Sequence, residues 1–175
     1  MIQQENATGK AAELLAGVQK ALGVTPNMTK AMANSPAVLK AYLEFSGALS
    51  GGKLPAPVRE RIAILVAQEN GCDYCLSAHS YIGTNLAGLD QAEVDLARKG
   101  GASDATARAA LTLAAEVVRS RGGIDDADLK TARESGLSDG DIAEVIAHVA
   151  LNVFTNYFNK AADVEIDWPV VRHNH

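Results

Sequence analysis

Residues 60–79 read ERIAILVAQENGCDYCLSAH, and this stretch sets the interpretation of the whole chain. An apolar helical run ends at the dipeptide Asn-Gly, which is typical of a helix C-terminus. Cys72, Cys75 and His79 follow at positions i, i+3 and i+7, which share one face of a helix. The stretch therefore predicts two helices joined by a break, with the only two cysteines of the chain in the first turn of the second helix.

Helical patterns continue outward from this stretch in both directions. Apolar residues recur at helical spacing, Gly and Pro separate the periodic segments, and no run is convincing as a strand. We expect an all-α fold, a compact multi-helix array that forms a single domain over residues 1–175. Its core motif lies in 55–90, a long C-terminal helix covers 138–162, and Ser103 is the expected N-cap of a helix at 104–121.

The composition agrees with a helical scaffold and excludes several classes of protein. Of 175 residues, 47% are hydrophobic and 31 are alanine, the best helix former, whereas only 8 are aromatic. The net charge of −5 argues against general nucleic-acid binding, which relies on neutralising phosphates. Two cysteines are too few for a disulfide framework or a four-thiolate zinc site.

The sequence carries no recognisable targeting or membrane signal. Residues 1–8 are polar and lack a charged-then-apolar signal pattern. The longest apolar runs fall far short of the roughly 20 residues that cross a bilayer. We therefore expect a cytoplasmic protein without membrane contact, whose cysteines are mostly kept as thiols.

The predicted position of the cysteines suits redox thiol chemistry. Backbone N–H groups and the positive end of the helix dipole stabilise a thiolate in the first turn of a helix. His79 lies one turn after Cys75, so its imidazole is placed to accept a thiol proton or to stabilise the thiolate as a cation. One low-pKa nucleophile, one resolving thiol and one base are what such chemistry requires.

Three other interpretations of the same residues stay open. The cysteines can be two small buried apolar side chains. They can bind zinc together with His79 and a fourth ligand from Glu60 or Glu69, in a zinc-stapled or redox-sensing protein without enzymatic activity. A lyase would instead need an acid/base group and cations that bind a carboxylate, a role for the arginines on either side of Glu60.

The spacing Glu-x11-Cys-x2-Cys-x3-His resembles the alkyl hydroperoxidase D core of the carboxymuconolactone decarboxylase superfamily. The stretch NVFTNYFN at 152–159 and the motif ending in EIDWP at 165–169 resemble peroxidase-related members of that superfamily. The resemblance covers about residues 25–169. It implies an alkyl hydroperoxidase D-like helical fold, a homo-oligomer (trimer or hexamer), and a thiol-dependent peroxidase that reduces alkyl hydroperoxides or hydrogen peroxide.

The resemblance also implies roles for particular residues. Cys75 matches the peroxidatic cysteine, Cys72 the resolving cysteine, and His79 and Glu60 a proton relay that serves both thiols. The best-characterised branch has a histidine where this chain has Tyr74, which is therefore an auxiliary candidate through its hydroxyl. No cofactor or metal is implied, and the expected partners are a peroxide and an external dithiol or protein disulfide reductant. A decarboxylase-like lyase acting on a lactone acid is the alternative within the superfamily.

Other polar residues are expected to be structural. His148 lies among apolar residues and is interpreted as a core histidine with its hydrogen bonds satisfied. Glu69 is expected to be a solvated residue near a helix end. His173 and His175 belong to a terminal segment that we expect to be mobile, and Trp168 is expected to anchor the end of the ordered chain.

Overall fold

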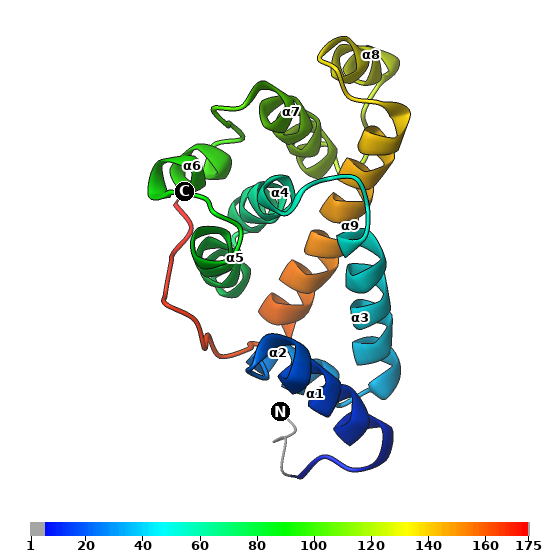
Figure 1. Ribbon diagram of the computed structural model, residues 1–175, viewed down its shortest axis with the longest axis vertical. Coiled ribbons are helices and arrows are strands. Elements are labelled where there is room, and N and C mark those ends of the chain that lie inside the picture. Colours follow the sequence, from blue (N-terminus) through cyan, green and yellow to red (C-terminus); the bar gives the residue numbers. More distant parts are fainter. Residues whose placement is uncertain (1–5, 175) are drawn as a thin grey trace.

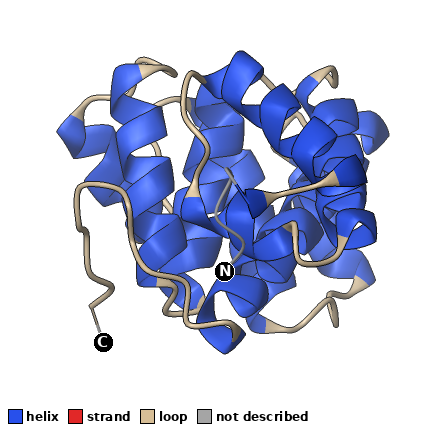
Figure 2. Ribbon diagram, turned by 90° about the horizontal axis from the view of Figure 1, so that it is seen from below, coloured by secondary structure: helices blue, strands red, loops and turns tan. Residues whose placement is uncertain are grey.

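The computed structural model describes residues 6–174, and in this range it consists of α-helices joined by loops, with no strand (Figure 2). The predicted all-α fold is therefore confirmed. The helices are α1 (Gly9–Leu22), α2 (Asn27–Met32), α3 (Pro36–Ser50), α4 (Ala56–Glu69), α5 (Asp73–Asn85), α6 (Gln91–Arg98), α7 (Ala105–Arg119), α8 (Asp126–Glu134) and α9 (Asp139–Ala161). None of them is long and apolar enough to cross a membrane.

Short polar side chains begin four of the later helices. Asp90, Asp104, Asp125 and Ser138 each accept a hydrogen bond from a backbone N–H of the first turn. The expected cap at Ser103 is wrong by one residue. Asp104 caps α7 through Ala107, at 2.7 Å, because a carboxylate at this position satisfies a free N–H of the first turn.

Helix α4 lies in the middle of the larger core, between α5, α6, α7 and α9 (Figure 1). Its residues from Ile62 to Ala67 are all buried. A helix that is apolar on all sides must be enclosed by others, which explains why α4 contacts four neighbours. Glu60, near the start of α4, is thereby held on a fixed element beside α5.

A second, smaller core joins the N-terminal helices to the rest. Leu15 of α1, Met32 of α2 and Leu39 of α3 are buried together, and Phe158 of α9 packs against both cores. Figure 1 shows α1, α2 and α3 gathered at the C-terminal half of α9. This arrangement places α3 across from α5, with α9 between them.

The segment after α9 runs back along α5 and ends beside α6 (Figure 1). The ring of Trp168 packs on Tyr81, with centroids 5.6 Å apart, so its expected role as an anchor is confirmed. The expected mobility is wrong for His173, whose backbone N–H and Nδ1 both contact the Asp73 carboxylate, at 2.9 and 2.7 Å. His175 and the first five residues, which include most of the polar stretch without a signal pattern, lie outside the described residues.

Candidate active site

Both cysteines lie where the sequence predicted, at the break between α4 and α5. Gly71 has φ +61°, a conformation that glycine adopts readily, and it ends α4 immediately before Cys72. Cys72 is the N-cap of α5, and its sulfur accepts the N–H of Cys75 at 3.4 Å. Both are free thiols with 1% and 2% of their surface exposed.

The surroundings of the two thiols shift their pKa values in opposite directions. The pKa of Cys75 is lowered, first by its hydrogen bond with Cys72 and then by side chains of α9, which together outweigh burial. The pKa of Cys72 is raised by the same hydrogen bond and by burial. Cys75 is therefore the cysteine of the pair that ionises first, and Cys72 donates a hydrogen bond to it.

Three polar residues of α9 lie beside the Cys75 sulfur, and their role was not predicted from the sequence. Asn159 Nδ2 lies 3.2 Å from Cys75 Sγ, and Thr155 and Asn156 also lower the pKa of Cys75. All three are buried in an otherwise apolar stretch of helix. Their spacing of one, three and four residues, which places them on one helical face, is a signal that the sequence did contain.

His79 and Glu60 form a contact that also fits the predicted relay. His79 Nδ1 lies 2.8 Å from Glu60 Oε2, and the two side chains are 24% and 18% exposed. Burial lowers the pKa of His79, but the charge and hydrogen bond of Glu60 outweigh it, so the pKa is raised. When Cys72 ionises, its negative charge raises the pKa of His79 further, which couples His79 to this cysteine.

Two side chains from other helices, Tyr42 and His148, also lie near Glu60. Burial, followed by the charges of Cys75 and Glu60, raises the pKa of Tyr42 on α3 to about 12. His148 on α9 is 5% exposed as expected, but its Nε2 has no hydrogen-bond partner among residues 6–174, so the expected satisfied histidine is wrong. Burial and then the charge of Arg59 lower its pKa, which favours a neutral imidazole.

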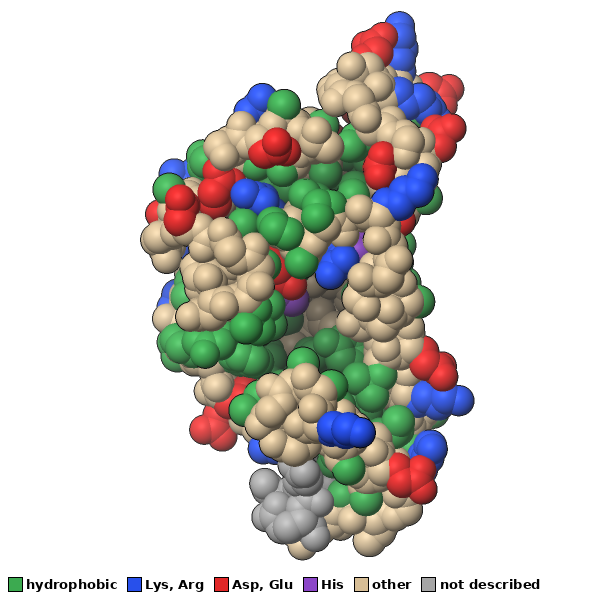
Figure 3. Space-filling model, viewed as in Figure 1, with side chains coloured by type: hydrophobic (Ala, Val, Ile, Leu, Met, Phe, Trp, Pro, Cys, Tyr) green, Lys and Arg blue, Asp and Glu red, His purple; other side chains and the backbone are tan. Residues whose placement is uncertain are grey.

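The surface is hollowed between the α5 side of the molecule and the α3 side. In Figure 3, histidine and acidic side chains lie inside this hollow on the face shown. The partial exposure of His79 and Glu60 means that solvent reaches their contact, whereas the cysteines lie deeper.

The Tyr74 hydroxyl is engaged by groups other than the two sulfur atoms. It donates to Asp167 Oδ1 at 2.8 Å and accepts the backbone N–H of Met28 at 3.1 Å, and Trp168 Nε1 lies at 3.4 Å. Burial is the main reason why the pKa of Tyr74 is raised. The hydroxyl joins α2 to the C-terminal segment.

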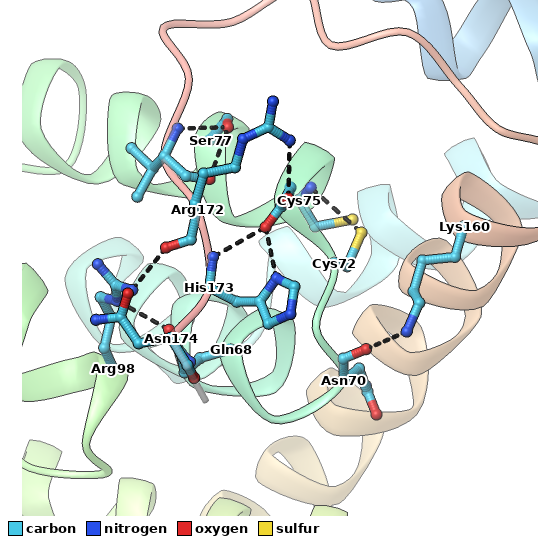
Figure 4. A network of polar contacts seen from close by, with 12 residues as sticks. Gln68, Asn70, Cys72, Cys75, Ser77, Arg98, Lys160, Arg172, His173 and Asn174 are labelled. Carbon is cyan, nitrogen blue, oxygen red and sulfur yellow. Dashed lines mark hydrogen bonds and ion pairs between the residues drawn. The ribbon is translucent and has the colours of Figure 1, made fainter.

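The C-terminal segment is fastened to the start of α5 beside the cysteines (Figure 4). Arg172 Nη1 lies 2.8 Å from Asp73 Oδ2, and the Val171 N–H donates to Ser77 Oγ at 2.9 Å. Together with the contacts of His173 on Asp73, these bonds fix residues 171–173 over the first turn of α5.

The residues proposed for a zinc site do not form one. In the part of the chain that the structure describes, no three His, Cys, Asp or Glu residues are grouped so that they could hold a metal ion. Glu69, the alternative fourth ligand, is exposed at the last residue of α4, as expected, and forms an ion pair with Arg119 Nη2 at 2.7 Å. The described residues therefore give the zinc-stapled alternative no support.

The two arginines beside Glu60 are already engaged. Arg61 is buried and contacts Glu93 at 2.7 Å, with side chains 10% and 13% exposed. Arg59 Nη1 donates to the carbonyl oxygens of Ser50 and Leu54 at 3.1 and 2.9 Å. The contact with Glu93 counts against a role for Arg61 in binding the carboxylate of a lactone acid, whereas the bonds of Arg59 use only its Nη1.

Comparison with known proteins agrees with this arrangement. The model of the carboxymuconolactone decarboxylase family matches residues 36–116, a range that contains Glu60, both cysteines and His79. No functionally curated protein resembles the chain significantly in sequence.

Several solved structures share the fold over nearly the whole chain. An alkylhydroperoxidase AhpD core, peroxidase-related protein from Ralstonia eutropha has a TM-score of 0.83 and 23% identity, covering 94% of this chain and 89% of that one. A peroxidase-related protein from Silicibacter has a TM-score of 0.79 and 28% identity, covering 89% and 84%. The debrominase Bmp8 in complex with 2,3,4-tribromopyrrole has a TM-score of 0.78 and 23% identity, covering 95% and 89%.

Proposed function

Because the carboxymuconolactone decarboxylase family model matches residues 36–116 and solved peroxidase-related structures share the fold, we propose that this chain is an alkyl hydroperoxidase D-like, thiol-dependent peroxidase. The observation that carries the proposal is the asymmetric pair of thiols at the start of α5. Cys75, with a lowered pKa, supplies a thiolate, and Cys72 lies one helical turn away as a thiol. A buried redox pair of this kind is hard to explain as a purely structural feature.

The first step oxidises Cys75. Its thiolate attacks one oxygen of the peroxide, a sulfur–oxygen bond forms, and the oxygen–oxygen bond breaks. The leaving alkoxide, or hydroxide from hydrogen peroxide, takes a proton and departs as an alcohol or water. The peroxide is reduced by two electrons, and Cys75 becomes a sulfenic acid.

The second step forms the disulfide, and it needs the proton of Cys72 to be removed. His79 is placed for this because its charge is coupled to that of Cys72 and because Glu60 makes its imidazole more basic. The Cys72 thiolate then attacks the Cys75 sulfur, and the hydroxyl leaves as water. An external dithiol or a protein disulfide reductant returns both thiols by exchange.

Tyr74 is not needed for either step. Its hydroxyl is already used by Met28 and Asp167, so we propose that it positions the C-terminal segment and does not transfer protons at the sulfurs. The expectation of a cytoplasmic homo-oligomer, trimer or hexamer, stays part of the proposal and is measurable by light scattering.

The test is consumption of an organic hydroperoxide or hydrogen peroxide in the presence of a small dithiol. The wild-type protein is expected to turn over, Cys75→Ser to lose all activity, and Cys72→Ser to react once and stop. Glu60→Gln is expected to slow turnover, whereas Glu69→Gln, with the same change of charge on the same helix, is its matched control. Unchanged turnover in Cys75→Ser would show that the assignment is wrong.

The family match makes a lyase the second candidate. It predicts that a Cys72→Ser/Cys75→Ser double variant keeps full activity on a lactone acid. The engagement of Arg61 argues against it, because Arg61 cannot bind a substrate carboxylate without first losing its ion pair with Glu93.

A further inference from the structure

Two polar atoms beside Cys75 are buried without partners. Among the described residues, Asn156 Nδ2 and Asn159 Oδ1 make no hydrogen bond, although the two residues are 0% and 3% exposed. One atom is a donor and the other an acceptor. Buried polar groups are normally paired, so an unpaired donor and acceptor at a reactive sulfur point to a state in which both are used.

The two carboxamides are oriented by the groups around them. Asn156 Oδ1 accepts from Asn70 Nδ2 at 2.9 Å, and the carbonyl oxygen of Asn70 accepts from Lys160 Nζ at 2.6 Å (Figure 4). Asn70 is therefore a positioning residue that turns Asn156 Nδ2 away from itself. Asn159 Nδ2 lies 3.2 Å from both Cys75 Sγ and Met28 Sδ. The Oδ1 of the same carboxamide therefore has no hydrogen-bond partner among the described residues.

We propose that Asn156 and Asn159 form a binding site for the sulfenic acid of Cys75. Asn156 Nδ2 donates to the new oxygen, and Asn159 Oδ1 accepts the hydrogen of the S–O–H group. The inference rests on the proposed peroxidase function, in which peroxide supplies this oxygen and Cys75 gives up two electrons. It adds two catalytic residues on a helix about 80 residues beyond the cysteine motif.

The same pair of amides serves the thiolate that precedes the sulfenic acid. Before oxidation, the donor Nδ2 of Asn159 lies 3.2 Å from the sulfur, and the Asn156 side chain also lowers the pKa of Cys75. When oxygen is added, the unused donor and acceptor gain partners. The site is thus complementary to the oxidised state more than to the resting thiol.

The test uses a Cys72→Ser background, in which the sulfenic acid cannot be resolved. An excess of hydrogen peroxide is added, because each of the two oxidations consumes one equivalent. Intact-protein mass spectrometry then follows the sulfenic acid and its further oxidation to the sulfinic acid. Asn156→Leu and Asn159→Leu are each expected to shorten the sulfenic lifetime by about two- to tenfold, the range for one net hydrogen bond. Asn152→Leu is the matched control, because Asn152 is equally buried but donates to the backbone carbonyl of His148.

A second measurement needs no peroxide. The pH midpoint for alkylation of Cys75 is expected to rise in Asn159→Leu and to stay unchanged in Asn152→Leu. If a leucine variant does not fold, Asn156→Asp and Asn159→Asp keep the volume and the helix, and they are expected to raise the midpoint further through charge repulsion.

The outcomes separate this inference from the proposed function. If dithiol-supported turnover depends on Cys75 but sulfenic lifetimes in the Asn156 and Asn159 variants equal that of Asn152→Leu, the peroxidase proposal stands and the inference is overturned. If the lifetimes shorten while dithiol-supported turnover is absent, the sulfenic site stands and the peroxidase cycle is wrong.

Discussion

Asp73, between the two cysteines, is expected to control the stability of the C-terminal segment. It accepts hydrogen bonds from the Arg172 guanidinium and from the backbone N–H of His173, and it contacts His173 Nδ1. Burial raises the pKa of Asp73, but these three contacts outweigh it and lower the pKa from 3.8 to about 2. The change Asp73→Asn removes the negative charge and keeps the shape.

The expected loss of stability in Asp73→Asn follows from the size of the Asp73 pKa shift. At about 1.4 kcal/mol per pH unit, the difference between the two pKa values sets an upper bound of about 2.4 kcal/mol on the contribution to folding. The Asp73 side chain is 21% exposed, but Arg172, its main partner, is 67% exposed, so solvent screens much of this interaction. We expect Asp73→Asn to lower the free energy of unfolding by about 1 kcal/mol at neutral pH.

The pH dependence has a fixed sign. Because the folded-state pKa is depressed, the contribution is fully present above pH 3.8 and is lost as pH falls through about 2. Urea unfolding of the wild type and Asp73→Asn between pH 3 and pH 7 is therefore expected to give a difference that shrinks toward the acid end.

Hydrogen exchange at the His173 amide tests the same reasoning locally, because this N–H donates to the carboxylate. It should exchange faster in Asp73→Asn. The control is Asp95→Asn on α6, where the carboxylate accepts only an exposed bond from Gln91. If Asp73→Asn costs no more stability than Asp95→Asn, or if its cost does not change with pH, the reasoning is wrong.

Three further predictions concern the framework of the site. Glu60→Gln removes the group that raises the pKa of His79 and leaves burial to lower it, so NMR titration should find that pKa below its ordinary value of 6.5 in the variant and above it in the wild type. Arg61→Met removes the ion pair with Glu93, which keeps its hydrogen bond from the Ser103 N–H, and should lower the free energy of unfolding by about 1–3 kcal/mol in urea. Gly71→Ala forces a side chain into a positive-φ position and should cost about 1–2 kcal/mol by thermal unfolding.

The fold was largely predictable because its signals are local. The break at Asn70-Gly71, the capping residues Asp90 and Ser138 and the Gly and Pro residues between the periodic segments all act within a few residues. The structure places helices between them. The one misplaced cap, Ser103 for Asp104, is an error between two adjacent residues that can both cap a helix.

The candidate site was predictable only in part. Spacing along α5 is enough to bring Cys72 and Cys75 together, because both lie within one turn of the same helix. Contact between Glu60 and His79 needs α4 and α5 to cross at the correct angle, and only the resemblance to a family suggested it. The hydrogen-bond partners of Tyr74 could not be predicted from spacing, because they lie on α2 and after α9.

The sequence by itself determined that this protein is all-α and that its two cysteines begin a helix with a histidine two turns on. Only the tertiary structure decided which groups act on the sulfurs. Asn159 contacts Cys75 from 84 positions away, and the segment at 171–173 is fastened to Asp73 by distant bonds. Periodicity encodes each helix within a few residues, whereas the partners of a buried sulfur depend on how the helices pack, which no local pattern records.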